Sequence, residues 1–181
     1  MFQVRIHGRG GQGVVTAAEL LSVAAFLEGK YAQAFPSFGS ERTGAPVVAF
    51  CRISDREIRL REPVIAPDAV IIQDKTVIEP AKAFSGVVKD GFALINSSQD
   101  ISGSLNVNNI KIKCVGATEI ALENIGRPLP NAVLLGSFSA FTGIIKLESV
   151  EEAIKTKFSG VIAEKNIAAA RVAYEKTLGE K

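Results

Sequence analysis

Three glycines near the N-terminus have the spacing of a loop that binds phosphate groups. Gly8, Gly10 and Gly13 form the pattern G-x-G-x-x-G between an expected strand and an expected helix, which is the context that this pattern requires. Glycines let the backbone turn tightly and approach a ligand, while free amides at a helix start attract an anion. Arg9 adds a positive charge beside these amides. The sequence therefore predicts an anion site at Gly8, Arg9, Gly10, Gly11, Gln12 and Gly13.

A simpler interpretation of the same glycines stays open. They are also needed where a strand crosses tightly into a helix against a neighbouring backbone, with no ligand involved. A dinucleotide-binding loop is normally followed, about 20 residues later, by an Asp or Glu at the end of the second strand. Gln33–Phe35 occupy that place here, because Glu28 comes too early and Glu41 too late. NAD is therefore disfavoured as the ligand.

A second polar loop follows the second expected strand. Residues 36–46 are rich in Ser, Gly and Pro, and they should emerge at the same carboxyl edge of the sheet as the glycines. The Arg42 guanidinium suits bidentate binding of a phosphate, and Glu41 is placed to orient it. The alternative is a solvated ion pair at a loop tip. The candidate ligand-binding residues of this loop are Ser37, Ser40, Glu41, Arg42, Thr43 and Gly44.

Cysteine and histidine are too few for several kinds of metal or catalytic site. Cys51 and Cys114 are the two cysteines, far apart in apolar runs, whereas a cubane iron-sulfur cluster needs four closely spaced thiolates. We interpret both as buried core thiols. His7 is the single histidine, which excludes a His-rich metal site, and we interpret it as a structural imidazole at a strand end. We expect no catalytic residue and no metal on this chain.

Charge and hydropathy exclude two further classes of protein. Lys plus Arg number 21 and Asp plus Glu 19, so the net charge of +2 argues against a nucleic-acid binder. The mean hydropathy is +0.22, yet no run approaches the roughly 18 apolar residues of a membrane span. Met1 leads directly into an alternating stretch, without the pattern of a signal peptide. We expect a cytoplasmic protein whose surplus apolar surface is buried at an interface.

The first half of the chain alternates between strand and helix patterns, which is typical of α/β domains. We expect a strand at Phe2–His7 and a helix at Val14–Leu27. That helix is apolar around most of its circumference, so it needs the sheet on one side and further cover, such as a partner chain, on the other. A second strand is expected at Lys30–Phe35, while Val47–Ile53 and Glu57–Leu60 indicate a hairpin.

The second half continues with strands and ends in helices. Strands are expected at Ala69–Gln73, Phe92–Ile95 and Ile110–Val115, with Asp74 or Thr76 capping a short helix. Helices are expected at Thr118–Ile125 and Asn131–Phe141, then after a capping box formed by Ser149 and Glu152, and last up to Gly179. We predict one Rossmann-like, three-layer α/β domain over residues 1–181, with a mostly parallel sheet, an antiparallel hairpin part and a helical C-terminus.

Three motifs of the chain form a long and specific pattern. They are HGRGGQG at residues 7–13, YAQAFP at 31–36 and GSERTGAP at 39–46. In order and spacing they resemble the gamma subunit of pyruvate:ferredoxin oxidoreductase. The resemblance extends through residues 67–72, 131–136 and 164–166, so it covers essentially the whole chain, and residues 85–113 are its least distinctive part.

The resemblance implies a subunit of a multisubunit enzyme. That enzyme converts a 2-oxoacid, coenzyme A and oxidised ferredoxin to acyl-coenzyme A, CO2 and reduced ferredoxin, and it also runs in reverse as a pyruvate synthase. Thiamine diphosphate, Mg²⁺ and iron-sulfur clusters belong, by the same resemblance, to sibling subunits of alpha, beta and delta type. This chain would serve as scaffold and contribute both polar loops to the coenzyme A environment, and it would be inactive alone.

Several alternatives remain open from the sequence. Gamma subunits of 2-oxoglutarate, 2-oxoisovalerate and indolepyruvate enzymes are related to those of pyruvate enzymes. A free-standing nucleotide-binding oxidoreductase would bind its nucleotide with the glycine loop, and a purely structural adaptor would bind nothing there. The sequence also leaves open whether the isolated chain is a monomer or a homodimer.

Overall fold

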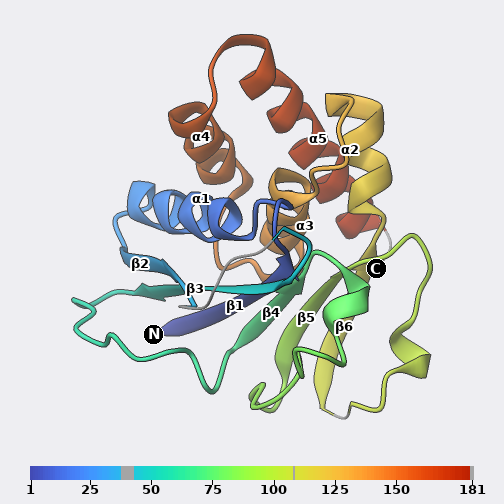
Figure 1. Cartoon of the computed structure of the whole chain (residues 1–181). Helices are drawn as coiled ribbons and strands as arrows, with labels where there is room; N and C mark the ends of the chain where they lie inside the picture. The colour runs from blue at the N-terminus through green and yellow to red at the C-terminus, as the bar shows by residue number, and fades with distance from the viewer. Residues whose placement is uncertain (38–42, 108, 180–181) are drawn as a thin grey trace.

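The chain forms a mixed sheet that carries its helices on one face (Figure 1). This computed structural model describes residues 1–37, 43–107 and 109–179. The strands in that part lie in the order β2-β3-β1-β4-β5-β6, with β3 antiparallel to both of its neighbours and the other pairings parallel. The predicted α/β class and mostly parallel sheet are thus confirmed. The strands are β1 (Phe2–Arg9), β2 (Tyr31–Pro36), β3 (Pro46–Ser54), β4 (Ala69–Ile72), β5 (Gly91–Asn96) and β6 (Ile110–Val115).

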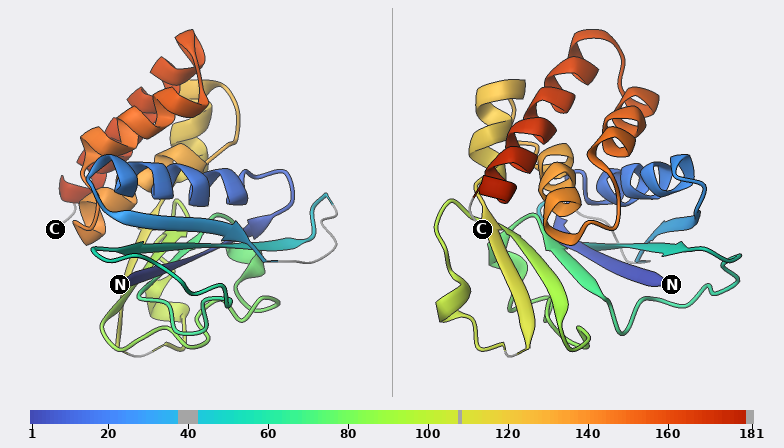
Figure 2. Two further views of the ribbon diagram at one scale, coloured as in Figure 1. Left: turned by 90° about the vertical axis from the view of Figure 1, so that its left-hand side faces the viewer. Right: turned by 180° about the vertical axis from the view of Figure 1, so that it is seen from behind.

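Two tiers of helices cover that face of the sheet (Figure 2). Helices α1 and α3 contact strands directly, and α4 and α5 pack onto them. The second side of α1 is covered by α4, where Lys157 Nζ donates to Glu19 Oε2 at 2.8 Å. The cover that we expected from a partner chain therefore comes largely from the chain itself. The helices are α1 (Val14–Leu27), α2 (Ala117–Ile125), α3 (Asn131–Thr142), α4 (Leu147–Lys157) and α5 (Gly160–Gly179).

The opposite face of the sheet is covered by a thinner layer of connecting segments. It includes the 3-10 helices η1 (Lys75–Val77) and η2 (Ser102–Ser104). Val70 and Ile72 of β4 point into this layer and pack in one buried cluster with Val77. The neighbouring residues Ala69 and Ile71 belong to the larger cluster beneath the helices. This alternation explains why β4 is apolar throughout, because a strand covered on both faces has no solvent side.

Two predicted local features are wrong. Glu57–Leu60 forms no strand, because β3 already has β1 on one edge and β2 on the other. The antiparallel part of the sheet is thus β3 inserted between two parallel strands. Ser149 does not cap a helix: α4 starts at Leu147, so Ser149 lies within its first turn. The predicted cap at Asp74 is confirmed, since its carboxylate accepts from the Thr76 amide at the start of η1.

Among the described residues, none of the helices has both the length and the hydropathy that a bilayer crossing demands.

Candidate functional site

The glycine loop, residues 8–13, joins the carboxyl end of β1 to the start of α1. Gly11 and Gly13 have φ of 95° and 74°, in the region where glycine is favoured. The Ala17 amide donates to the Gly13 carbonyl at 2.9 Å, and the helical amides before it have no carbonyl to bond within the helix. No described side chain caps this helix start. The start of α1, whose residues 14–16 line the adjoining pocket, therefore has amides available to a ligand.

The second loop connects β2 to β3, and its described residues 43–45 touch the glycine loop. The Gly10 amide donates to the Ala45 carbonyl at 2.9 Å, and the Gly44 amide donates to the Gly10 carbonyl at 3.2 Å. The two loops thus meet at one edge of the sheet. Of the predicted residues, Ser37, Thr43 and Gly44 lie within the described part, whereas Ser40, Glu41 and Arg42 lie outside the described residues.

A shallow pocket of about 320 Å³ opens beside the glycine loop. Its lining joins the loop to the first turn of α1 and to Val47 at the start of β3. This volume lies at the lower end of the ~300–1,000 Å³ range of sites that enclose drug-sized molecules, so the pocket holds only part of a molecule as large as a nucleotide cofactor. The lining residues are Arg9, Gly10, Gly11, Gly13, Val14, Val15, Thr16 and Val47.

Arg9 ties the two loops to a third segment. Its Nε and Nη2 donate to the Thr76 hydroxyl at 2.9 and 2.7 Å, and its Nη1 donates to the Gly44 carbonyl at 2.9 Å. Its Nε also lies 3.5 Å from an Asp74 carboxylate oxygen. The guanidinium was predicted to face an anion. Three of its five N–H groups are engaged by described residues, and the other two have no partner among those residues.

The glycine loop is closed by the side chain of Gln12. The Gln12 Oε1 accepts from the Arg9 amide at 2.7 Å, and its Nε2 donates to an Asp74 carboxylate oxygen at 2.9 Å. Asp74 also accepts from the Thr76 amide and hydroxyl. Desolvation raises the pKa of Asp74, but the hydrogen bonds from Thr76 and Gln12 outweigh it, so the pKa is lowered overall. Asp74 and Thr76 are the site residues that sequence reasoning recognised only as a helix cap.

Two of the glycines are also required by packing. A Cβ on Gly8 would lie 2.7 Å from Val14 Cγ2, and a Cβ on Gly13 would lie 2.7 Å from Asn131 Nδ2. A Cβ on Gly11, by contrast, would meet no described atom within 4 Å. Packing therefore explains Gly8 and Gly13 without a ligand, whereas Gly11 faces open space at the pocket.

His7 lies inside β1 and is only 2% exposed. Its Nε2 accepts from Arg5 Nε at 3.0 Å, so its Nδ1 carries the ring proton; Nδ1 has no partner among the described residues. Burial, followed by the charge of Arg5, lowers the pKa of His7 to about 3. The imidazole is thus a neutral structural group, as predicted, although it is not at the strand end.

This burial predicts a pH dependence of stability. The pKa of His7 is about 6.5 in the unfolded chain and about 3 in the folded chain. Between these values the unfolded state binds more protons, so stability falls as the pH falls. From pH 7 to pH 5 we expect His7 to lower the free energy of unfolding by about 2 kcal/mol. Urea unfolding of the wild type and His7→Gln at both pH values measures it, and equal losses in the two proteins would contradict it.

The two cysteines differ in environment. Cys51 is fully buried in β3, and burial raises the pKa of its thiol, which agrees with a core role. Cys114 in β6 is only half-buried, so its predicted core role is wrong in part. It lines a larger cavity.

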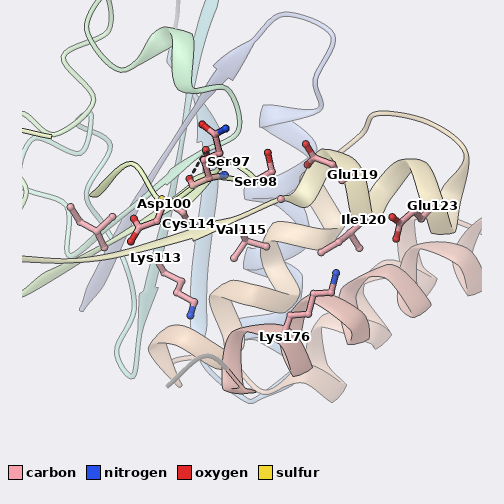
Figure 3. Close-up of a pocket in the computed structure, with 13 residues that line it drawn as sticks. Ser97, Ser98, Asp100, Lys113, Cys114, Val115, Glu119, Ile120, Glu123 and Lys176 are labelled. Carbon is pink, nitrogen blue, oxygen red and sulfur yellow. Dashed lines mark hydrogen bonds between the residues drawn. The ribbon is translucent and has the colours of Figure 1, made fainter. Parts of the chain in front are cut away.

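That cavity, of about 640 Å³, lies at the carboxyl ends of β5 and β6 (Figure 3). Lys113 and Lys176 border it together with Glu119, and Figure 3 shows Lys176 extending from α5 toward Ile120 of α2. Asp100 and Glu123 also line it, so three acidic and two basic side chains are mixed around this cavity. None of the residues predicted from the sequence to bind a ligand lines it.

Comparison with known proteins places the chain. Residues 3–176 match the family of pyruvate ferredoxin/flavodoxin oxidoreductases. The chain belongs to this family. A relative from Methanothermobacter marburgensis, pyruvate synthase subunit PorC, is 51% identical over 97% of both chains. Another from Pyrococcus furiosus, the gamma subunit common to pyruvate and ketoisovalerate oxidoreductases, is 48% identical over 98% of this chain and 97% of that one.

Solved structures of pyruvate ferredoxin oxidoreductase relatives share the fold. The crystal structure of pyruvate oxidoreductase subunit PORC from Thermotoga maritima matches with a TM-score of 0.85 at 41% identity, over 96% of this chain and 95% of that one. The 2-oxoglutarate:ferredoxin oxidoreductase from Magnetococcus marinus matches with a TM-score of 0.82 over 99% of this chain and 31% of that one. At 16% identity, the second likeness shows the fold alone.

Proposed function

We propose that this chain is the gamma subunit of a pyruvate:ferredoxin oxidoreductase. The observation that carries the proposal is the 51% identity to a pyruvate synthase subunit along nearly the whole length of both chains. The complex would convert pyruvate, coenzyme A and oxidised ferredoxin to acetyl-coenzyme A, CO2 and reduced ferredoxin in the cytoplasm. Subunits of alpha, beta and delta type would hold thiamine diphosphate, Mg²⁺ and the clusters, since two distant cysteines cannot ligate a cubane here.

The proposed contribution of this chain is to bind coenzyme A. The diphosphate of coenzyme A is an anion, and the glycine loop presents unbonded helix amides to a pocket at the meeting point of two loops. Backbone amides orient an anion without supplying or removing protons. The chain therefore positions the acyl acceptor, and the chemical steps belong to groups on other subunits. Arg42 and the two remaining N–H groups of Arg9 would add charge-assisted bonds.

Purification from the native cells tests membership of the complex. A tagged copy of the chain should retain three further chains, thiamine diphosphate and the visible absorbance of iron-sulfur clusters. The purified complex should then reduce ferredoxin with pyruvate and coenzyme A. A preference for 2-oxoglutarate or indolepyruvate would replace the proposed substrate, and recovery of the chain alone would contradict the proposal.

Arg42→Ala tests the binding of coenzyme A. Loss of one charged hydrogen bond to a phosphate corresponds to about 1 kcal/mol, so we expect the apparent KM for coenzyme A to rise about fivefold. The half-reaction that decarboxylates the 2-oxoacid without coenzyme A should keep its rate. Steady-state kinetics of the reconstituted complex measures both quantities. Arg59→Ala, which removes an exposed arginine paired with Glu57, is a matched control and should change neither.

A structural adaptor is the second candidate function. It is favoured by the packing of Gly8 and Gly13, which explains two of the glycines without any ligand. An adaptor predicts that substitutions in the glycine loop weaken assembly of the complex and leave the KM for coenzyme A unchanged. The kinetic comparison above therefore separates the two functions.

A further inference from the structure

Asp74 stands outside both loops in the sequence, yet it contacts the side chains that shape them. It follows β4, and its two carboxylate oxygens accept different donors. Oδ2 accepts from Gln12 Nε2 at 2.9 Å, while Oδ1 accepts from the Thr76 amide at 2.9 Å and from the Thr76 hydroxyl at 2.6 Å. One oxygen of the carboxylate thus connects to the glycine loop through Gln12, and the other connects toward the second loop through Thr76.

The hydrogen bond between Asp74 and Gln12 leads to the glycine loop. Gln12 uses its amide nitrogen on Asp74, which leaves its carbonyl oxygen to accept from the Arg9 amide at 2.7 Å. Because an amide side chain has a donor end and an acceptor end, the acceptor on Asp74 determines which way Gln12 points. The orientation of Gln12 in turn fixes the backbone of Arg9 at the start of the loop.

The hydrogen bonds between Asp74 and Thr76 lead to the second loop. Thr76 donates its hydroxyl proton to Asp74, so the hydroxyl oxygen is left to accept from Arg9. Arg9 then reaches the Gly44 carbonyl at 2.9 Å. Asp74, Thr76, Arg9 and Gly44 form a continuous chain of hydrogen bonds from the end of β4 to the second loop.

We propose that Asp74 is a positioning residue that holds the glycine loop and the segment 43–45 of the second loop in one arrangement for binding an anion. It acts through Gln12 and Arg9 and touches no ligand. The step from arrangement to coenzyme A rests on the proposed function, whereas the step from Asp74 to the loops rests on the hydrogen bonds alone.

Asp74→Asn is the informative substitution because it keeps the size and removes one acceptor. An amide in this place offers one oxygen, which can face either Gln12 or Thr76 but not both. If the oxygen of the new amide faces Thr76, its N–H group faces the N–H group of Gln12. If the oxygen faces Gln12, its N–H group faces the Thr76 backbone amide. If Gln12 turns instead, the N–H group of Gln12 faces the Arg9 backbone amide. Asp74 is only partly buried and Thr76 is exposed, so the displaced donor turns to water and one of the two hydrogen-bond connections is lost.

The second variant combines Asp74→Asn with Gln12→Glu. The carboxylate now stands at position 12, where it accepts from the Arg9 amide and from the new amide at position 74, which keeps its own oxygen for Thr76. The net charge equals that of the wild type, and the pattern of donors and acceptors that joins position 12 to position 74 and position 74 to Thr76 is restored. A residue that merely filled space would not be rescued by exchanging the two side-chain types.

The experiment uses the assembled complex and two readouts. Amide hydrogen exchange over residues 8–16 should be about tenfold faster in Asp74→Asn and should return toward the wild-type rate in the double variant. The apparent KM for coenzyme A should rise about fivefold, with the coenzyme-independent decarboxylation unchanged. Asp100→Asn is the matched control: Asp100 accepts from the Ser102 amide at 2.9 Å in the same two-residue pattern, and it lines the cavity at the ends of β5 and β6, which contains no residue of either loop. It should alter neither readout.

The outcomes separate the inference from the proposed function. Faster exchange that the double variant reverses supports the role of Asp74, and unchanged exchange in Asp74→Asn overturns it. Faster exchange with an unchanged KM supports the positioning of the loops while contradicting coenzyme A as their ligand.

Discussion

Replacing Gly136 by alanine is expected to destabilise the chain more than the same replacement at Gly8, Gly11 or Gly13. Gly136 lies in α3, where an added Cβ would stand 2.1 Å from the Ala170 carbonyl oxygen of α5. The obstacle is helix backbone, which cannot rotate away as a side chain can. The two helices would have to separate along their contact. Overpacking of a core costs about 1–3 kcal/mol and occasionally more, and we expect about 3 kcal/mol here.

Urea unfolding followed by circular dichroism measures this loss of stability. Gly103→Ala is the control, because an added Cβ there would meet no described atom within 4 Å and the φ of Gly103 is not in the left-handed region. Its unfolding midpoint should match the wild type. A Gly136→Ala protein as stable as this control would show that α3 and α5 do not pack as closely as described.

Gly11→Ala is expected to weaken the binding of coenzyme A more than the other substitutions do. Gly11 lines the glycine-loop pocket, and an added Cβ would enter space that no described atom occupies within 4 Å. The methyl group would take the place where an anion approaches the amides, and a φ of 95° would strain the loop that presents them. We expect the KM for coenzyme A to rise at least about tenfold, which corresponds to ~1.4 kcal/mol of binding free energy.

Gly29→Ala provides a control for backbone strain. Gly29 has φ of 76° and, like Gly11, no described atom within 4 Å of an added Cβ, but it follows α1 at the other end of that helix. Both variants should lose similar stability, and only Gly11→Ala should change the kinetics with coenzyme A. An equal KM in the two variants would favour the structural adaptor.

Local patterns in the sequence were sufficient to locate the elements around the site. The apolar run ending at Leu27 predicted α1 with both of its ends, because such a helix needs no distant information to be recognised. The edge shared by the two loops followed from the rule that parallel strands end on the same side of a sheet. The contacts of Gly10 with Gly44 and Ala45 confirm that inference directly.

Long-range pairing was the part that the sequence could not reveal. Whether residues 57–60 form a strand depends on a free edge of β3, and β1 and β2 occupy both edges. Likewise, nothing local indicates that Asp74 meets Gln12, which lies 62 residues earlier. A single acidic residue before a short helix reads as a cap, and only the fold shows that its second oxygen faces the glycine loop.

A structure of the assembled complex with coenzyme A bound tests the central claim most directly. We expect density for the diphosphate within hydrogen-bonding distance of the amide of Gly11 or of the amides of residues 13–16, with Arg9 still joined to Gly44. Diphosphate density elsewhere, such as in the cavity at the ends of β5 and β6, with solvent over the glycine loop, would contradict it.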